Sequence, residues 1–165
     1  MYNLILKIFI FYIFTVNSYA TTININENTY SKYILDKSYI YLSNNLSSTL
    51  NDIKNKDIKL IKNSKKIMMY KNNSNLKIWI KFTIKNNSNQ TVEKVLRYKS
   101  TYTIKIYFYK EDKERKLEGL LHTNKNRKSV TPYFNIKLAK NDIKTYYYIS
   151  LCKYVSYEST CISTK

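Results

Sequence analysis

Residue types that commonly carry catalysis are scarce in this chain of 165 residues. It has one His (His122), one Gly (Gly119) and two Cys. A single Gly excludes a P-loop and a dinucleotide fingerprint, because both need several glycines where the backbone approaches phosphate. A single His excludes a multi-histidine metal site, two Cys cannot complete a four-ligand zinc site, and no nucleophile motif surrounds His122. We therefore expect no cofactor and no resident metal.

The acidic residues do not form a recognisable catalytic pair. Four of them cluster in a lysine-rich stretch: Glu111, Asp112, Glu114 and Glu118. Glycoside hydrolysis needs two carboxyl groups on opposite sides of the substrate, whereas a mixed-charge loop is typical of simple charge balance. We predict that the protein is not an enzyme.

The amino terminus has the features of a secretory signal peptide over residues 1–20. A basic residue precedes an apolar run at 8–16, and Ser18 and Ala20 are small residues at the positions that signal peptidase reads. The alternative is an uncleaved membrane anchor, but this run is too short to span about 30 Å of hydrocarbon. We expect residues 21–165 to form one exported domain in the periplasm.

The two cysteines lie near the carboxyl end, as Cys152 and Cys161. An oxidising compartment favours a disulfide between them, which would stabilise the fold by about 2–3 kcal/mol on the chain-entropy model. The alternative is two unpaired thiols, one of them buried as a small apolar side chain.

The chain is strongly basic, with 29 Lys and Arg against 11 Asp and Glu and a formal net charge of +18. Removal of residues 1–20, which contain Lys7 and no acid, leaves +17. One interpretation of this positive charge is that the protein binds a polyanion. The lysines are spread along the chain without a block of five or six, so a solvated surface is the better reading, and we expect no nucleic acid partner.

The chain beyond residue 76 alternates between apolar and polar residues with the period of two that is typical of half-buried strands. The residues expected to face inward are Ile78, Ile80, Phe82 and Ile84, then Val92, Leu96 and Tyr98, then Tyr102, Ile104, Ile106 and Phe108, then Phe134, Ile136 and Leu138. Further strands are expected at 117–122 and 144–151, a charged loop at 110–116, and polar turns at 86–90 and 139–142. Short strands separated by turns predict an all-β, antiparallel β-sandwich.

The first third of the chain has weaker patterns. Tyr39–Leu42 predicts an edge or entry strand of the sheet, and 58–61 is a weak strand candidate. Thr49 is followed three residues later by Asp52, which is the spacing of a helix-capping box, so one short helical turn is expected there near the N-terminus.

The strand and turn at residues 78–88 resemble the Trp-bearing strand and Asn turn of a bacterial sensor domain. The family is the second type of extracellular domain of seven-transmembrane receptors with diverse intracellular signalling modules. Other segments resemble this family in order: 39–42 with 50–53, Val95-Leu96, Ile106-Tyr107, Gly119 through Arg127, 134–138, and 146–149. The turn before the last family strand contains Gly, whereas this chain has Ala139-Lys140-Asn141-Asp142 there.

The resemblance implies a jelly-roll β-sandwich outside the cytoplasmic membrane that senses carbohydrates or related small molecules. A receptor of this kind would continue into membrane helices, and this chain stops at Lys165. We therefore expect a free sensory domain or a truncated form of a receptor's extracellular region, with a membrane receptor or a periplasmic protein as a further partner. The alternative is a periplasmic protein-interaction module without a small-molecule ligand.

A carbohydrate site needs an aromatic platform for the C–H faces of the sugar and polar groups for its hydroxyls. Trp79, Tyr107 and Tyr109 lie opposite the apolar phase of their strands, so they are the expected platform. Arg97 and Arg127 are the expected donors, with His122 as a further candidate, and Arg127 could hold a carboxylate with two hydrogen bonds. The alternative for the aromatic residues is a second packing face.

Overall fold

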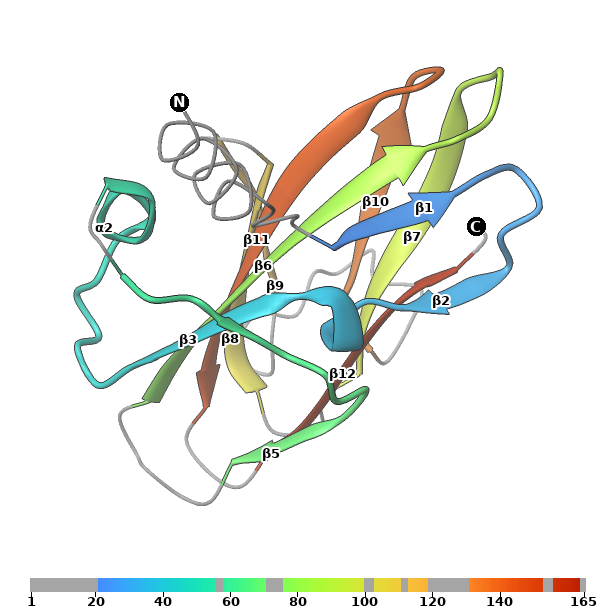
Figure 1. The fold of residues 1–165 in the computed structure, drawn as a ribbon. Coiled ribbons are helices and arrows are strands. Elements are labelled where there is room, and N and C mark those ends of the chain that lie inside the picture. The colour runs from blue at the N-terminus through green and yellow to red at the C-terminus, as the bar shows by residue number, and fades with distance from the viewer. Residues whose placement is uncertain are drawn as a thin grey trace, which may run out of the picture.

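The computed structural model describes residues 21–55, 58–70, 76–99, 103–110, 113–118, 131–152 and 156–163. Within them the chain forms two β-sheets, a short 3-10 helix η1 (Leu35–Lys37) and a short α-helix α2 (Leu50–Asn55). Figure 1 shows the sheets packed as two layers, with α2 on the side of the larger sheet that faces away from the smaller one. The fold is therefore a β-sandwich with one helical piece near the N-terminus, as predicted.

The larger sheet has seven strands in the order β4-β3-β6-β11-β8-β9, with β1 also paired to β6. Their bounds are β1 Thr22–Ile25, β3 Tyr39–Ser43, β4 Ile61–Lys62, β6 Leu76–Asn86, β8 Thr103–Lys110, β9 Lys113–Glu118 and β11 Ile143–Cys152. β3 pairs with the first half of β6, antiparallel, and β1 pairs with its last residues, parallel. The long β6 thus has two short partners along one edge and β11 along the other.

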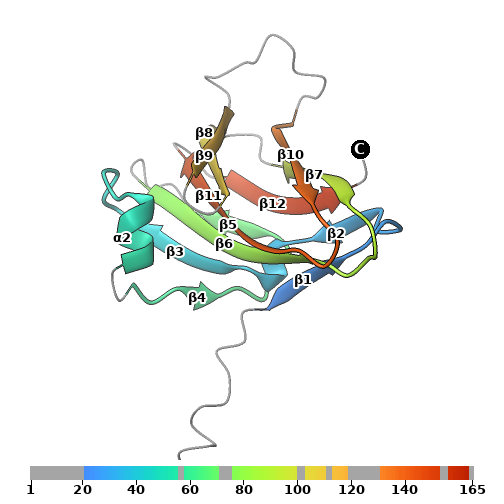
Figure 2. The same cartoon turned by 90° about the horizontal axis from the view of Figure 1, so that it is seen from above.

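The smaller sheet has the order β10-β7-β12-β2, with β5 also paired to β12. Its strands are β2 Ser31–Tyr33, β5 Met68–Tyr70, β7 Val92–Lys99, β10 Tyr133–Leu138 and β12 Ser156–Ser163. Figure 2 shows β7, β10 and β12 on one side of the layer that contains β3 and β6. Every pairing in this sheet is antiparallel.

The core lies between the two sheets and confirms the predicted inward phases. The sequence expectation was right for every strand whose side chains are described: Ile78, Ile80, Phe82 and Ile84; Val92, Leu96 and Tyr98; Ile106 and Phe108; Phe134, Ile136 and Leu138. β11 adds Tyr146, which stacks on Phe82 and Phe108 at centroid distances of 5.7 and 5.4 Å. It also adds Tyr148, whose ring is tilted against those of Phe82, Phe108 and Phe134 at 5.3–5.5 Å. A band of aromatic rings therefore crosses the centre of the sandwich.

Two local predictions were wrong. The stretch 110–116, expected to be a charged loop, mostly belongs to β9. β9 pairs only with β8 among the described strands, and an edge strand can be rich in charged residues without apolar alternation. The weak strand expected at 58–61 begins only at Ile61, where two residues pair with β3. At those two residues β3 lies between β4 and β6, and Tyr41–Ser43 pair with β6 alone among the described strands.

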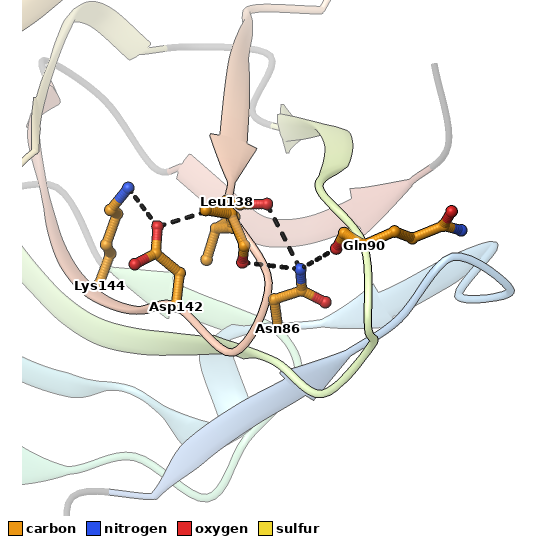
Figure 3. Close-up of polar contacts among 6 residues, drawn as sticks. Asn86, Gln90, Leu138, Asp142 and Lys144 are labelled. Atoms are coloured by element: carbon orange, nitrogen blue, oxygen red, sulfur yellow. Dashed lines mark hydrogen bonds and ion pairs between the residues drawn. The ribbon is translucent and has the colours of Figure 1, made fainter.

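The predicted polar turn at 86–90 is organised by the buried side chain of Asn86, drawn in Figure 3. Its Nδ2 donates to the carbonyl oxygens of Gln90 (2.7 Å), Ala139 (2.9 Å) and Leu138 (3.3 Å). Its Oδ1 accepts from the backbone N and the hydroxyl of Ser88, at 3.0 and 2.7 Å. One amide thus joins the turn after β6 to the turn after β10, so it links the two sheets.

The second turn, at 139–142, contains no Gly and uses Asn at its left-handed position. Asn141 has a φ of 58°, in the left-handed region that favours Gly and that Asn tolerates better than most residues. Asp142 completes the turn: its Oδ2 accepts from the backbone N of Ala139 at 3.1 Å and pairs with Lys144. The missing Gly therefore does not prevent the turn from forming.

Candidate functional site

The outer face of the larger sheet, turned away from the smaller sheet, carries a second cluster of aromatic residues. We call it the outer cluster and define it as Tyr41, Trp79, Tyr107, Tyr109 and Tyr147. Trp79 and Tyr147 are buried, and the other three are half-buried. A face that is polar in most sandwiches is thus aromatic here.

Strand register brings these residues together. Tyr41 of β3 lies opposite Trp79 of β6, Trp79 lies opposite Ile149 of β11, and Ile149 lies opposite Tyr107 of β8. In the next row, Tyr147 lies opposite Tyr109. Side chains opposite one another on the same face are about 4.5–5.5 Å apart at Cβ, so the rows form a continuous surface across four strands.

Helix α2 covers one side of the outer cluster. Its buried residues Leu50 and Ile53 pack on Trp79 and Tyr147. The predicted capping box is present: the backbone N of Thr49 donates to Asp52 Oδ2 at 2.9 Å, and the backbone N of Asp52 donates to Thr49 Oγ1 at 3.3 Å. These bonds satisfy backbone donors at the start of a helix too short to be stable alone, so packing on the cluster and the cap hold it together.

Lys77 of β6 is the charged residue of this site. It is 9% exposed, and its Nζ donates to the carbonyl oxygens of Leu46 (3.1 Å) and Ser48. The ammonium lies 5.1 Å from the ring centroid of Trp79, and the indole Nε1 of Trp79 donates to Ser48 Oγ at 3.2 Å. Burial lowers the pKa of Lys77, an effect that the negative charge of Asp52 partly opposes.

A cleft of ≈ 380 Å³ opens between α2 and the sheet at this point. It is lined by Ser47, Ser48, Thr49, Leu50, Asn51, Lys77, Trp79, Tyr109 and Ile149. Rings, hydroxyl groups and one buried cation therefore meet in one concave site. Such a mixture suits a small ligand with apolar faces and several polar groups.

The structure brings together part of the predicted site. Trp79, Tyr107 and Tyr109 share one face and one cluster, as the alternation indicated, although Trp79 is only 1% exposed and also serves the packing role named as its alternative. Arg97 does not join them: it lies in β7 of the other sheet, exposed, and opposite in phase to the core residues Leu96 and Tyr98.

Other predicted residues fall where little or nothing is described. Arg127 and His122 lie outside the described residues, as does the predicted signal peptide at 1–20. Cys152 is the last residue of β11, and Cys161 lies in β12 of the other sheet. Their side chains are outside the described part, so the disulfide stays a prediction.

The sequence reasoning missed Tyr41, Tyr147 and Lys77. Lys77 is two residues from Trp79 and therefore in phase with it, a signal that was available. Tyr147 lies in a run of three tyrosines, which gives no phase by itself. Tyr146 and Tyr148 point into the core, and Tyr147 points outward to α2.

A second cleft, of ≈ 460 Å³, lies between the sheets where β10 approaches β8 and β11. Its floor is apolar and its rim is basic, and its lining residues are Thr91, Phe108, Lys110, Asn135, Ile136, Lys137, Ala139, Lys144 and Tyr146. Two of the rim lysines are paired: Lys144 with Asp142 at 2.5 Å, and Lys137 with Glu93 at 3.0 Å. The hydrogen bond from Lys144 lowers the pKa of Asp142. Much of the rim charge is thus already balanced.

The described residues contain no group of three or more His, Cys, Asp or Glu placed to hold a metal ion. Among the helices in that part of the chain, none is both long enough and apolar enough to cross a lipid bilayer.

Comparison with known proteins gives one family. No curated protein matches the chain. A family model described as 7TMR-DISM extracellular 2 matches residues 35–151, from the start of η1 to the next-to-last residue of β11. The matched part includes β3, α2, the outer cluster and both turns joined by Asn86. Since the match covers well over half of the chain, the protein belongs to this family, the extracellular sensor domains of seven-transmembrane receptors.

Proposed function

We propose that the protein is an exported sensory domain that binds a carbohydrate or a related small molecule on the outer face of its larger sheet. The observation that carries the proposal is the cleft at Trp79 and Tyr109, where aromatic rings meet the hydroxyl groups of Ser47, Ser48 and Thr49. Rings pack on the C–H faces of a sugar, and hydroxyl groups bond to its hydroxyls.

The half-buried rings are the part of the cluster that a ligand reaches first. Tyr107 and Tyr109 are partly accessible, whereas Trp79, which also lines the cleft, is buried. In this proposal the domain is exported through residues 1–20 to the periplasm, and it acts as a free sensor or as the extracellular region of a membrane receptor. Binding, not catalysis, is its activity.

The experiment uses the single Trp of the chain, which lies in the proposed site. The purified protein is titrated with a panel of mono- and oligosaccharides and small metabolites while Trp79 fluorescence is recorded, and melting temperatures are measured in parallel. At least one compound is expected to give a saturable fluorescence change together with a rise in melting temperature, because a ligand that binds only the folded state stabilises it.

Two variants locate the binding. Tyr109→Ala removes one ring of the cleft and should weaken binding by about tenfold or more, since stacked aromatic contacts are worth about 0.5–1.5 kcal/mol beyond their buried area. Arg97→Ala, on the far sheet, should leave the affinity unchanged. If no compound changes either readout, or if Tyr109→Ala binds like the unmodified protein, the proposed site is wrong.

A second candidate function, docking of a periplasmic protein, is favoured by a different observation. Leu42 of β3 and Ile61 of β4 are 45% and 67% exposed and line a mostly apolar groove at the end of the larger sheet. An exposed apolar groove at a sheet edge is a common docking surface. Cross-linking in a periplasmic extract should then give one stoichiometric partner that Ile61→Asp loses and Arg97→Ala keeps.

A further inference from the structure

The strongest unexplained feature of the cleft is the ammonium group of Lys77. Lysine side chains are almost never buried without a charged partner, and Lys77 is 9% exposed. It has three donor hydrogens, and two of them are used by the carbonyl oxygens of Leu46 and Ser48. Within the described part of the chain it forms no salt bridge with a carboxylate.

Asp52 is the acidic residue that acts on Lys77, and it does so through space. Its Oδ2 is occupied by the backbone N and the hydroxyl of Thr49, where it caps α2. Because burial outweighs this attraction, the pKa of Lys77 falls. A buried cation with a spare donor and no bonded counterion is an unfavourable arrangement that a ligand anion would relieve.

Two further lysines lie at the outer cluster, beside its second buried ring, Tyr147. Lys54 of α2 and Lys81 of β6 place their ammonium groups 5.7 and 5.9 Å from the ring centroid of Tyr147. With Lys77 over Trp79, the two fully covered rings of the cluster are both approached by lysine. A positive potential on a partly apolar face attracts and orients anions.

We propose that the ligand of this cleft is an acidic saccharide, with its carboxylate bound by Lys77 and its ring packed on Tyr109, beside the buried Trp79. This inference rests on the proposed function and narrows it to one class of ligand. Ser47, Ser48 and Thr49 line the same cleft and are the partners of the sugar hydroxyls. The carboxylate then takes the remaining donor of Lys77 in a charge-assisted hydrogen bond.

The test compares ligands that differ only in charge. Oligosaccharides of galacturonate, glucuronate and mannuronate are titrated against the protein beside their methyl esters, which keep the skeleton and lose the negative charge. The acid is expected to bind about tenfold more tightly than its ester at low salt, the size expected for one charge-assisted bond. The preference should shrink as salt is added.

The structure offers a matched control for Lys77. Lys94 is 3% exposed, its Nζ also donates to two backbone carbonyls, those of Glu27 and Thr29, and burial also lowers its pKa. It lies in β7 and does not line this cleft. Lys77→Met should bring the acid-to-ester ratio close to one, whereas Lys94→Met should keep it. Melting curves of both variants show whether they fold.

The outcomes separate the two proposals. If a neutral saccharide binds as tightly as the acids or more so, the charge inference is wrong and the proposed function stands. If no saccharide or metabolite of either panel binds, the proposed function itself fails. If Lys77→Met does not fold, the comparison of acid with ester in the unmodified protein decides: equal affinities overturn the inference, and a salt-sensitive preference for the acid supports it.

Discussion

The most informative perturbation of the fold is Asn86→Ala. The Asn86 side chain is fully buried and forms five contacts within hydrogen-bond distance, three through Nδ2 and two through Oδ1. The side-chain amide has two donor hydrogens, so the three carbonyl acceptors share them. Truncation therefore removes about four hydrogen bonds at once, and these bonds join the turn after β6 to the turn after β10.

The expected loss follows from those contacts. At about 1 kcal/mol net for each hydrogen bond, four bonds give about 4 kcal/mol, and buried carbonyls left without a partner add to it. Domains of this size have free energies of unfolding of about 5–15 kcal/mol, so the variant should lose a large part of its stability and melt far lower. The effect should extend to the sandwich as a whole, because each of the two turns connects a strand of one sheet to a strand of the other.

The assay is urea unfolding followed by the fluorescence of Trp79. Asn87→Ala is the matched control, because Asn87 is the next residue in the same turn, is exposed, and has only its backbone N in a described bond, to Ile25. It should change the free energy of unfolding by less than about 0.5 kcal/mol. Asn86→Asp should be as harmful as Asn86→Ala, since it places an acceptor against three carbonyl oxygens.

A loss below about 1 kcal/mol for Asn86→Ala would refute this reasoning, because it would mean that water or a rearranged turn replaces the amide at little cost. An Asn86→Asp variant as stable as the unmodified protein would contradict the assigned orientation of the amide.

Three further changes test the local geometry. Thr49→Ala should cost about 1 kcal/mol in urea unfolding by removing the cap of α2, whereas Asn51→Ala, at the exposed second residue of the helix, should cost much less. Asn141→Val should destabilise by about 1–2 kcal/mol and Asn141→Gly should not, because φ is 58° there. The hydrogen bond from Lys144 lowers the pKa of Asp142, so the contribution of this carboxylate to folding stability is present above its unfolded pKa and is lost as the pH falls through its folded pKa. The melting temperature of Asp142→Asn should therefore depend less on pH below about 4 than that of the unmodified protein. Equal acid sensitivity of the two proteins would show that this carboxyl is not the group that titrates.

Much of the fold could be predicted because alternation is local. In β6, a residue's position relative to Ile78 and Ile80 decides its face, and that is how Trp79 was placed with Tyr107 and Tyr109. The spacing of Thr49 and Asp52 likewise gave the cap of α2, since the bonds of a capping box span three residues.

The failures have a common physical origin in long-range pairing. The sequence of β9 predicted a charged loop, because an edge strand needs no apolar face. Its pairing with β8 is known only from the tertiary structure. Arg97 lies in the other sheet from Trp79, and the sequence separation of the two residues gave no hint of that. Tyr147 could not be assigned a face inside a run of three tyrosines until β11 was registered against β6.

The sequence alone therefore determined the class of fold, the family resemblance, the inward faces of the main strands and the scarcity of catalytic residue types. These follow from residue type and short-range periodicity, which any window of the chain contains. Only the tertiary structure decided that α2 covers the outer cluster, that Lys77 is buried beside Trp79, and that Asn86 joins two turns 52 residues apart. Those features depend on which strands pair and in which register. The free energy of that pairing comes from contacts between segments that are far apart in the sequence.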